Sequence, residues 1–374
     1  MRVAVVHEWL VNYAGSERVV EQILSLYPHA ALYSLVNFLD DSSSDFIHHR
    51  SVQTSFIQNL PFAKRSFRSY LPLMPLAIEQ LDVSGYDVVI SSSHAVAKGV
   101  IPRADQLHIS YVHTPIRYAW DLQHQYLHGA GLKRGIKGAI ARLILHYLRL
   151  WDLASANRVD HFVANSHYVA RRIWKTYRRK ATVIYPPVAV QRFNPHCQRE
   201  KFYFVLARFV PYKQVELIVA AFVRLGLPLV VMGDGPDERK LRRLAASNIQ
   251  FLSPQSEAIV ASYMARCKAF VYAAEEDFGI AAVEAQAAGA PVIAFGKGGV
   301  TETVIPGKTG LFFLEQSVES LIESVKEFES GAHHFSPDYA RQNAERFASE
   351  RFRQEFSQFV EQKWIHFRRG DDIQ

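Results

Sequence analysis

Residues 181–188 read Ala-Thr-Val-Ile-Tyr-Pro-Pro-Val, and this stretch decides how the chain is divided. A short apolar run is followed directly by two prolines, and another proline comes at position 195. Because proline lacks a backbone N–H and restricts the residue before it, regular structure is excluded here and a linker is expected. Apolar runs alternate with helix-compatible sequence on both sides of this break, so two domains are predicted.

The part before the break opens with a strand, loop and helix pattern. Residues 3–6 form an apolar run, a polar loop follows, and apolar residues then recur at helical spacing: Val19, Val20, Ile23 and Leu24. Further strands are predicted at residues 87–91, 107–112, 161–165 and 181–184. This alternation is typical of a parallel sheet with helices on both faces.

The part after the break repeats the same pattern. Strands are predicted at residues 202–206, 227–232, 249–252, 269–272 and 291–295, with helices between them such as 236–246 and 281–288. The predicted fold class is therefore α/β, with two Rossmann-like doubly wound domains facing each other across a cleft. We place the first domain at residues 1–188 and the second at 189–355. We expect residues 356–374 to form a helix and tail that pack back on the first domain.

Composition narrows the cellular setting. About half of the 374 residues are hydrophobic, and the two cysteines, Cys197 and Cys267, have no neighbours at metal-ligand spacing. The apolar run at residues 3–6 stops at His7 and Glu8, which is too short for an export signal. No apolar stretch approaches the roughly 18–20 residues that span a bilayer. We expect a cytoplasmic protein, either soluble or lying on a membrane.

The positive charge is confined to the first half. Residues 1–190 hold 21 Lys and Arg against 13 Asp and Glu, and the remaining residues hold 22 against 23. A one-sided excess indicates an anionic partner such as phospholipid, lipid phosphate or polynucleotide. Since no recognised nucleic-acid-binding motif accompanies it, we predict a membrane surface and no nucleic acid.

Two loops of the first domain carry candidate ligand-binding residues. Gly15 opens a predicted helix, where backbone N–H groups can approach an anion such as phosphate, although an unliganded turn glycine is equally consistent. His113 stands just beyond a predicted strand end, where ligands of open α/β sheets bind. A purely structural histidine remains the alternative.

Arg208 and Lys213 follow the first strand of the second domain. Two cations five residues apart on one loop can clamp a diphosphate and neutralise the charge of a leaving group, in place of a metal ion. The alternative is a pair of solvated surface cations.

The strongest pattern runs from Glu276 through Phe278 and Gly279 to Glu284. If a helix begins near Gly279, its free N–H groups point toward a ligand, and Glu284 lies about one to one and a half turns in. Both carboxylates then face one ligand at different depths. A glycine-rich run at residues 296–299, with Glu302, follows the next strand and is a further candidate to approach the ligand.

These motifs together resemble a known family. The two glutamates separated by seven residues, the Arg208 and Lys213 pair, the turn at 233–236 and the helix at 284–289 are similar to glycosyltransferase family 4, retaining enzymes of the GT-B fold. Residues 9–19, 70–100 and 111–121 resemble its bacterial GDP-mannose-dependent mannosyltransferases of O-antigen and exopolysaccharide synthesis. The resemblance implies transfer of a hexose, mannose from GDP-mannose, to a lipid-linked glycan acceptor at the inner face of the plasma membrane.

The resemblance also implies a role for each site residue. Glu276 lies by the donor sugar hydroxyls, Glu284 accepts from the ribose, and His113 lines the sugar and acceptor side. Gly15 closes on the diphosphate that Arg208 and Lys213 hold. The residues implied in catalysis are His113, Glu276, Arg208 and Lys213, and those implied in donor binding are Gly15, Arg208, Lys213, Glu276, Phe278, Gly279, Ile280 and Glu284. Ala14 and Ala207 stand where the family often has glycine.

The implied chemistry needs no metal, no cofactor and no enzyme nucleophile. No Asp-x-Asp pair occurs in the sequence, and the family's front-face mechanism lets the departing phosphate take the acceptor proton. Glu276 is therefore not assigned a covalent role, although glycosidases use carboxylates that way.

Other functions stay open on the sequence. A UDP-sugar-dependent transferase of the same fold, a sugar-nucleotide epimerase or a phosphorylase fits the same motifs. A non-enzymatic protein that binds anionic ligands fits only the basic first half. An oxidoreductase is disfavoured because no Gly-x-Gly-x-x-Gly follows the first strand. Neither the acceptor glycan, the linkage nor the oligomeric state follows from the sequence.

Two segments are candidates for membrane contact. In residues 62–70, aromatic and basic side chains alternate, and we prefer this run. Residues 133–154 place apolar side chains at helical spacing among cations, which suits either a helix on anionic lipid or one packed on the sheet.

Overall fold

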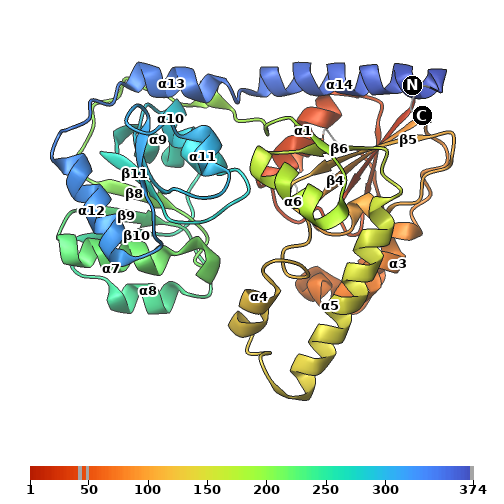
Figure 1. Ribbon diagram of the computed structural model, residues 1–374, viewed down its shortest axis with the longest axis horizontal. Helices are drawn as coiled ribbons and strands as arrows, with labels where there is room; N and C mark the ends of the chain where they lie inside the picture. The colour runs from red at the N-terminus through yellow and green to blue at the C-terminus, as the bar shows by residue number, and fades with distance from the viewer. Residues whose placement is uncertain (41–43, 48–49, 371–374) are drawn as a thin grey trace. The chain divides into compact units, whose positions relative to one another are not determined.

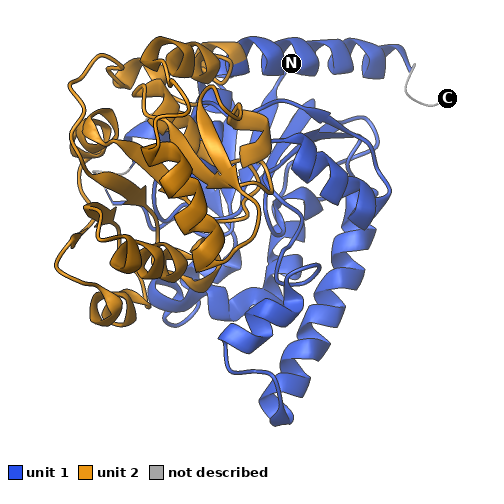
Figure 2. Ribbon diagram, turned by 60° about the vertical axis from the view of Figure 1, so that its left-hand side comes forward, with its two compact units in different colours: residues 1–187, 352–374 blue, residues 188–351 orange. Residues whose placement is uncertain are grey.

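The computed structural model describes residues 1–40, 44–47 and 50–370, which fall into two compact units (Figure 2). Unit 1 consists of Met1–Pro187 together with Phe352–Gln374, and unit 2 is Val188–Arg351. The chain thus leaves unit 1 within the proline-containing break and returns to it near the C-terminus. The sequence places these two boundaries after residues 188 and 355, one and four residues later than the structure does.

Unit 1 is built on a seven-stranded parallel sheet (Figure 1). The strand order is β3-β2-β1-β4-β5-β6-β7, so the order reverses between β1 and β4. The strands are β1 (Val3–His7), β2 (Ala31–Ser34), β3 (Val52–Thr54), β4 (Val88–Ser93), β5 (Leu107–Val112), β6 (His161–Ala164) and β7 (Ala181–Val183). β1, β4 and β5 are buried along their whole length, and their sequences are mostly apolar except at the end of β4, which closes with three serines.

Helices cover this sheet. They are α1 (Gly15–Leu26), α2 (Ala63–Ser66), α3 (Met74–Glu79), α4 (Gln123–Gly129), α5 (Gly135–Ala156) and α6 (His167–Tyr177). The C-terminal helix α14 (Ser349–Arg369) begins at the end of unit 2 and belongs to unit 1 from Phe352 onward. The apolar face of α1 is fully buried, as its helical spacing predicts. In Figures 1 and 2 the end of α5 that begins at Gly135, with α4 beside it, extends away from the sheet.

The C-terminal helix α14 completes the core of unit 1. Phe352 and Phe356 are fully buried, and their rings lie 5.8 and 6.2 Å from the ring of Tyr111 on β5. Farther along, Phe359 and Val360 belong to the same cluster. The last segment of the chain therefore packs on the first domain.

Unit 2 contains a six-stranded parallel sheet in the order β10-β9-β8-β11-β12-β13. Its strands are β8 (Tyr203–Leu206), β9 (Leu229–Met232), β10 (Ile249–Leu252), β11 (Ala269–Tyr272), β12 (Val292–Phe295) and β13 (Gly310–Phe313). Its helices are α7 (Val215–Leu225), α8 (Glu238–Leu244), α9 (Glu257–Arg266), α10 (Ile280–Ala287), α11 (Val300–Thr303), α12 (Val318–Glu329) and α13 (Pro337–Glu345). Strand order reverses between β8 and β11. The prediction of two Rossmann-like doubly wound domains is confirmed.

Candidate active site

The reversal of strand order fixes where each unit is expected to bind a ligand. At such a switch point the loops beyond the carboxyl ends of neighbouring strands diverge and leave a crevice. In unit 2 these are the loops after β8 and β11, which carry Arg208, Lys213 and Glu276. In unit 1 they are the loops after β1 and β4, with the loop after β5, which carries His113, beside them.

The loop after β8 is held in place by a tight turn. The Phe209 N–H donates to the carbonyl of Asp234 at 2.6 Å, and the Asp237 N–H donates to the carbonyl of Phe209 at 3.1 Å. Gly233 has a φ of +148°, and a Cβ there would lie 1.9 Å from a carbonyl oxygen of the loop. Glycine is thus required at this position because a side chain would collide with the loop that carries the exposed Arg208.

Glu276 is the centre of the unit 2 site. One carboxylate oxygen pairs with the ammonium group of Lys213, and the other accepts a hydrogen bond from the hydroxyl of Tyr272 at the end of β11. The side chains of Glu276 and Lys213 keep 17% and 20% of their surface exposed. An anion and a cation therefore stand side by side, both within reach of a ligand.

The motif continues into α10, which begins at Ile280. Gly279 is its N-cap, with a left-handed φ of +89° that favours glycine. The first N–H groups of a helix have no intrahelical acceptor, so this end attracts anions. Phe278 is buried against Phe347, and Glu284, in the second turn, is only 6% exposed. The two glutamates thus lie at different depths.

The glycine-rich run after β12 supports the motif from behind. The Gly299 N–H donates to the carbonyl of Glu276 at 2.8 Å, and Gly298 forms a parallel bridge with the same residue. A Cβ on Gly299 would lie 2.2 Å from the carbonyl oxygen of Asp277. This run positions Glu276 by close backbone packing.

In unit 1, His113 is fixed by three hydrogen bonds. Its Nε2 lies 2.8 Å from Oγ of Ser92, its backbone N–H donates to the carbonyl of Ser93, and its carbonyl accepts from the side-chain amide of Asn165. Burial, together with the nearby rings of His94 and His7, holds the pKa of His113 well below its ordinary value. The imidazole is therefore neutral at physiological pH.

A buried carboxylate shapes the loop after β4. Glu8 is fully buried at the end of β1 and accepts five hydrogen bonds, from the Ser93 hydroxyl and from backbone N–H groups of the four residues that follow it: His94, Ala95, Val96 and Ala97. Burial acts to raise the pKa of Glu8, but His94 and the backbone donors outweigh it, and the pKa is lowered. The ionised carboxylate thus holds His94 beside Trp9, with ring centroids 4.7 Å apart.

Gly15 begins α1, and Glu17 in the same turn folds back on it. One oxygen of Glu17 accepts from the Ala14 N–H at 3.1 Å and from the Ser16 hydroxyl at 2.9 Å. The other lies 3.3 Å from Nε2 of His7. The loop that bears Gly15 is therefore tied to the end of β1.

Comparisons with known proteins agree with this architecture. A family model described as Glycosyltransferase Family 4 matches residues 15–192, and one described as Glycosyl transferases group 1 matches residues 190–347. The solved structure of HepE from Anabaena in complex with UDP-glucose has a TM-score of 0.69 at 16% identity, over 97% of this chain and 100% of that one. The chain has the GT-B glycosyltransferase fold.

Curated relatives of this GT-B chain include glycosyltransferases. An uncharacterized glycosyltransferase of Methanocaldococcus jannaschii is 31% identical over 209 residues, 54% of this chain and 56% of that protein. The GDP-mannose-dependent alpha-(1-6)-phosphatidylinositol monomannoside mannosyltransferase of Mycobacterium tuberculosis is 30% identical over 194 residues, 43% of this chain and 50% of that protein. The matched region thus spans about half the length of these relatives.

Sequence reasoning did not single out several residues of this GT-B site. Ser92 and His94 contact the ring of His113, His7 contacts Ser92, and Glu17 contacts His7. Tyr272 contacts Glu276. A usable signal was present, because three serines and a histidine at residues 91–94 end a buried strand where apolar residues are usual.

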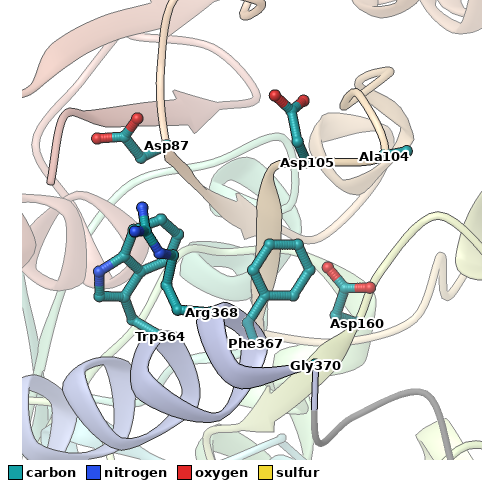
Figure 3. Close-up of a pocket in the computed structure, with 8 residues that line it drawn as sticks. All are labelled: Asp87, Ala104, Asp105, Asp160, Trp364, Phe367, Arg368 and Gly370. Carbon is teal, nitrogen blue, oxygen red and sulfur yellow. The ribbon is translucent and has the colours of Figure 1, made fainter.

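A hollow of about 480 Å³ lies at the opposite edge of the unit 1 sheet, where β4, β5 and β6 begin (Figure 3). Figure 3 shows Trp364, Phe367 and Arg368 of α14 facing its carboxylates. Asp87 and Asp160 already accept backbone hydrogen bonds. Ligands of GT-B and related folds bind at the carboxyl ends of strands, so this hollow is separate from the candidate active site.

In the part of the chain that the structure describes, no group of His, Cys, Asp and Glu is arranged to hold a metal ion.

Proposed function

We propose that the chain is a metal-independent, retaining glycosyltransferase that transfers a hexose from a nucleotide diphosphate donor to a lipid-linked glycan. The observation that carries this proposal is the pairing of Glu276 with Lys213 beside the N-terminus of α10. A carboxylate suits sugar hydroxyls, while an ammonium group and a helix N-terminus suit phosphate. The match of both halves to glycosyltransferase family models supports the same activity.

The residues are assigned the following parts in the reaction. Arg208 and Lys213 bind the diphosphate, and they stabilise the charge that develops as the bond between the sugar C1 and the phosphate oxygen breaks. The acceptor oxygen bonds to C1 on the same face, and its proton passes to the departing phosphate. Glu276 accepts from sugar hydroxyls, and Glu284 accepts from the ribose. Gly15 is assigned to the diphosphate and His113 to the sugar.

GDP-mannose is the proposed donor. Mannosyltransferases from Mycobacterium tuberculosis and Corynebacterium glutamicum, both named as GDP-mannose-dependent, are 30% and 32% identical over about half of their lengths. A UDP-sugar donor is the second candidate, because HepE has a similar fold and binds UDP-glucose. An epimerase differs from both in converting the donor with no acceptor present.

A panel of nucleotide sugars tests these candidates. Purified protein is mixed with each donor, with and without a lipid-linked glycan extract, and nucleotide release and the product sugar are measured. Release of GDP from GDP-mannose only when acceptor is present supports the proposal. An altered nucleotide sugar without acceptor indicates an epimerase, and no turnover with any donor contradicts a transferase.

Replacement of the central carboxylate gives a sharper test of the site. Glu276→Gln keeps the shape but loses the charge that faces Lys213, and turnover is expected to fall on the order of 100-fold. Glu275→Gln is the matched control, since Glu275 pairs instead with the exposed Lys297 at 3.1 Å. Equal effects of the two substitutions would contradict the assignment.

We also propose that unit 1 docks on the cytoplasmic face of the plasma membrane through α5. Among the described residues, no helix has the length and apolar character needed to cross a bilayer. One side of α5 nevertheless exposes a row of large apolar side chains, spaced three or four residues apart: Ile136, Ile140, Leu143, Tyr147, Leu150 and Leu153. Lys133, Arg134 and Lys137 are exposed around its first turn, which suits anionic lipid.

The run at residues 62–70 is less suited to this contact than its sequence indicates. Phe67 is 4% exposed and lies in the core, and the Arg68 guanidinium lies over the rings of Trp9 and Phe67. Phe62, Lys64 and Arg65 remain exposed. We therefore propose α5, instead of residues 62–70, as the segment that contacts the membrane.

Vesicle sedimentation separates these ideas. The double variant Ile136→Ser, Leu143→Ser is expected to bind phosphatidylglycerol vesicles about 100-fold more weakly, because each buried aliphatic side chain contributes about 1.5 kcal/mol or more. Leu314→Ser is the control, since Leu314 is 80% exposed in unit 2 and Ile136 is 81% exposed in unit 1. Wild-type protein that ignores these vesicles at low salt would refute docking.

A further inference from the structure

Four side chains of unit 1 form a continuous hydrogen-bonded chain that ends at His113. Nε2 of His113 lies 2.8 Å from Oγ of Ser92, and the same Oγ lies 3.1 Å from Nδ1 of His7. Nε2 of His7 lies 3.3 Å from Oε1 of Glu17. His7, Ser92 and Glu17 are at most 2% exposed, so water does not compete for these partners.

The register of the sheet creates this chain. His7 ends β1 and pairs directly with Ser92 on β4, which in turn pairs with Tyr111 on β5, two residues before His113. Glu17 reaches His7 from the first turn of α1. β1, β4, the loop after β5 and α1 thus contribute one member each, at the carboxyl edge of the sheet.

The direction of every proton follows from the carboxylate. Glu17 uses its Oε2 to accept from the Ala14 N–H and the Ser16 hydroxyl. Burial acts to raise the pKa of Glu17, but the interactions with His7, Ser16 and the backbone together outweigh it, and the pKa is lowered. An ionised carboxylate only accepts, so His7 must carry its proton on Nε2. With its proton on Nε2 alone, His7 accepts at Nδ1 from the hydroxyl of Ser92, whose oxygen accepts from Nε2–H of His113.

We propose that Glu17, His7 and Ser92 are positioning residues that fix the proton of His113 on Nε2. Nδ1 of His113 then presents a lone pair, so His113 acts on its ligand as a hydrogen-bond acceptor. An acceptor selects a hydroxyl donor, such as a sugar hydroxyl, and disfavours phosphate. The choice of a hydroxyl ligand rests on the proposed glycosyltransferase function, whereas the proton position is a property of the free protein.

The tautomer can be measured without substrate. Protein labelled with 15N-histidine is studied by NMR at about pH 8, above the ordinary histidine pKa of about 6.5. Protonated and bare ring nitrogens differ strongly in 15N chemical shift, and the signals of His113 are those lost in His113→Gln. Nε2–H in the wild type supports the proposal, and Nδ1–H overturns it.

Glu17→Gln makes the sharpest perturbation, because it reverses the chain without changing its shape. The Ala14 N–H and the Ser16 hydroxyl hold the amide oxygen at the Oε2 position, which turns the amide NH2 toward His7. His7 then accepts at Nε2 and carries its proton on Nδ1, Ser92 turns over, and His113 is left with its proton on Nδ1. A folded variant with an unchanged His113 tautomer would overturn the proposal.

Glu21→Gln is the matched control on the same helix. Glu21 accepts from the hydroxyl of Tyr13 at 2.8 Å and is not part of the chain, so this variant should keep the wild-type tautomer. With the donor identified, Glu17→Gln should lower kcat/KM on the order of 10-fold and leave the Kd for the free nucleotide unchanged. Failure of the nucleotide-sugar panel refutes the proposed function but leaves the NMR result standing, so the two failures are distinguishable.

Discussion

Removal of the buried Glu8 carboxylate should lower the free energy of unfolding of unit 1 by an amount that follows from its hydrogen bonds. In Glu8→Gln the amide oxygen can keep the four hydrogen bonds that Oε1 accepts in the wild type. The amide NH2 then faces the N–H of Val96, which in the wild type donates to Oε2 at 2.8 Å. One charge-assisted bond is lost and one buried donor is left unpaired, so the free energy of unfolding should fall by about 2–3 kcal/mol. Glu8→Ala removes every acceptor and should cost on the order of 5 kcal/mol.

Tryptophan fluorescence reports this change selectively. All five tryptophans belong to unit 1, so urea unfolding followed at their emission measures that unit: Trp9, Trp120, Trp151, Trp174 and Trp364. Glu21→Gln, on α1 of the same unit, controls for the loss of a carboxylate. If the free energy of unfolding of Glu8→Gln lies within about 0.5 kcal/mol of the wild-type value, the five hydrogen bonds do not stabilise the loop as argued.

The stabilisation from Glu8 should also depend on pH. Because the folded-state pKa lies below the ordinary Glu value of about 4.3, the contribution is fully present above that value and is lost as pH falls through the folded pKa. The difference in stability between wild type and Glu8→Gln should therefore shrink in acid. A constant difference from neutral pH down to about pH 3 would show that the carboxylate is not the titrating group.

Three further predictions concern other parts of the molecule. Since Arg208 and Lys213 are assigned to the diphosphate, activity should survive EDTA, and loss that Mg²⁺ restores would contradict this assignment. Glu284→Ala should weaken nucleotide binding about 10-fold or more by calorimetry, with the fold checked by circular dichroism; an unchanged Kd would remove Glu284 from the ribose. Asp152→Ala should destabilise unit 1 by about 3–5 kcal/mol in the fluorescence assay, because it leaves Lys98, 1% exposed, without its carboxylate partner; an effect below about 1 kcal/mol would show that Lys98 finds another partner.

The sequence predicts most strands of both sheets, including the edge strands β7 and β10, but it misses β2, β3 and β13. The predicted strand at 107–112 matches β5, and that at 269–272 matches β11, because strands buried on both faces of a sheet are rich in apolar residues. β3 was not predicted, because three residues, of which the middle one is exposed and the other two only partly buried, are too few to give a periodic signal. β13 was also missed, since it starts at Gly310, where a Cβ would lie 2.0 Å from the carbonyl oxygen of Val292.

The same contrast applies to the candidate site. Arg208, Lys213 and Glu276 could be selected because they occur in local motifs directly after strands. The partners of His113 could not, because His7 and Ser92 are 85 residues apart and meet only through the register of β1 and β4. Local patterns predict which loops bear chemistry, whereas the contacts between loops depend on strand order and register.

The return of α14 to unit 1 has a consequence for how the protein is made on the ribosome. Unit 2 is an insertion, and Phe352 and Phe356 reach the core only after residues 188–351 have been synthesised. At about 5–20 residues per second, the nascent first domain waits on the order of 10 s with the ring of Tyr111 uncovered. Unit 2, which is continuous, can fold during that interval, and a nascent chain that stops at Arg351 should yield a folded second domain beside a first domain prone to chaperone binding and proteolysis.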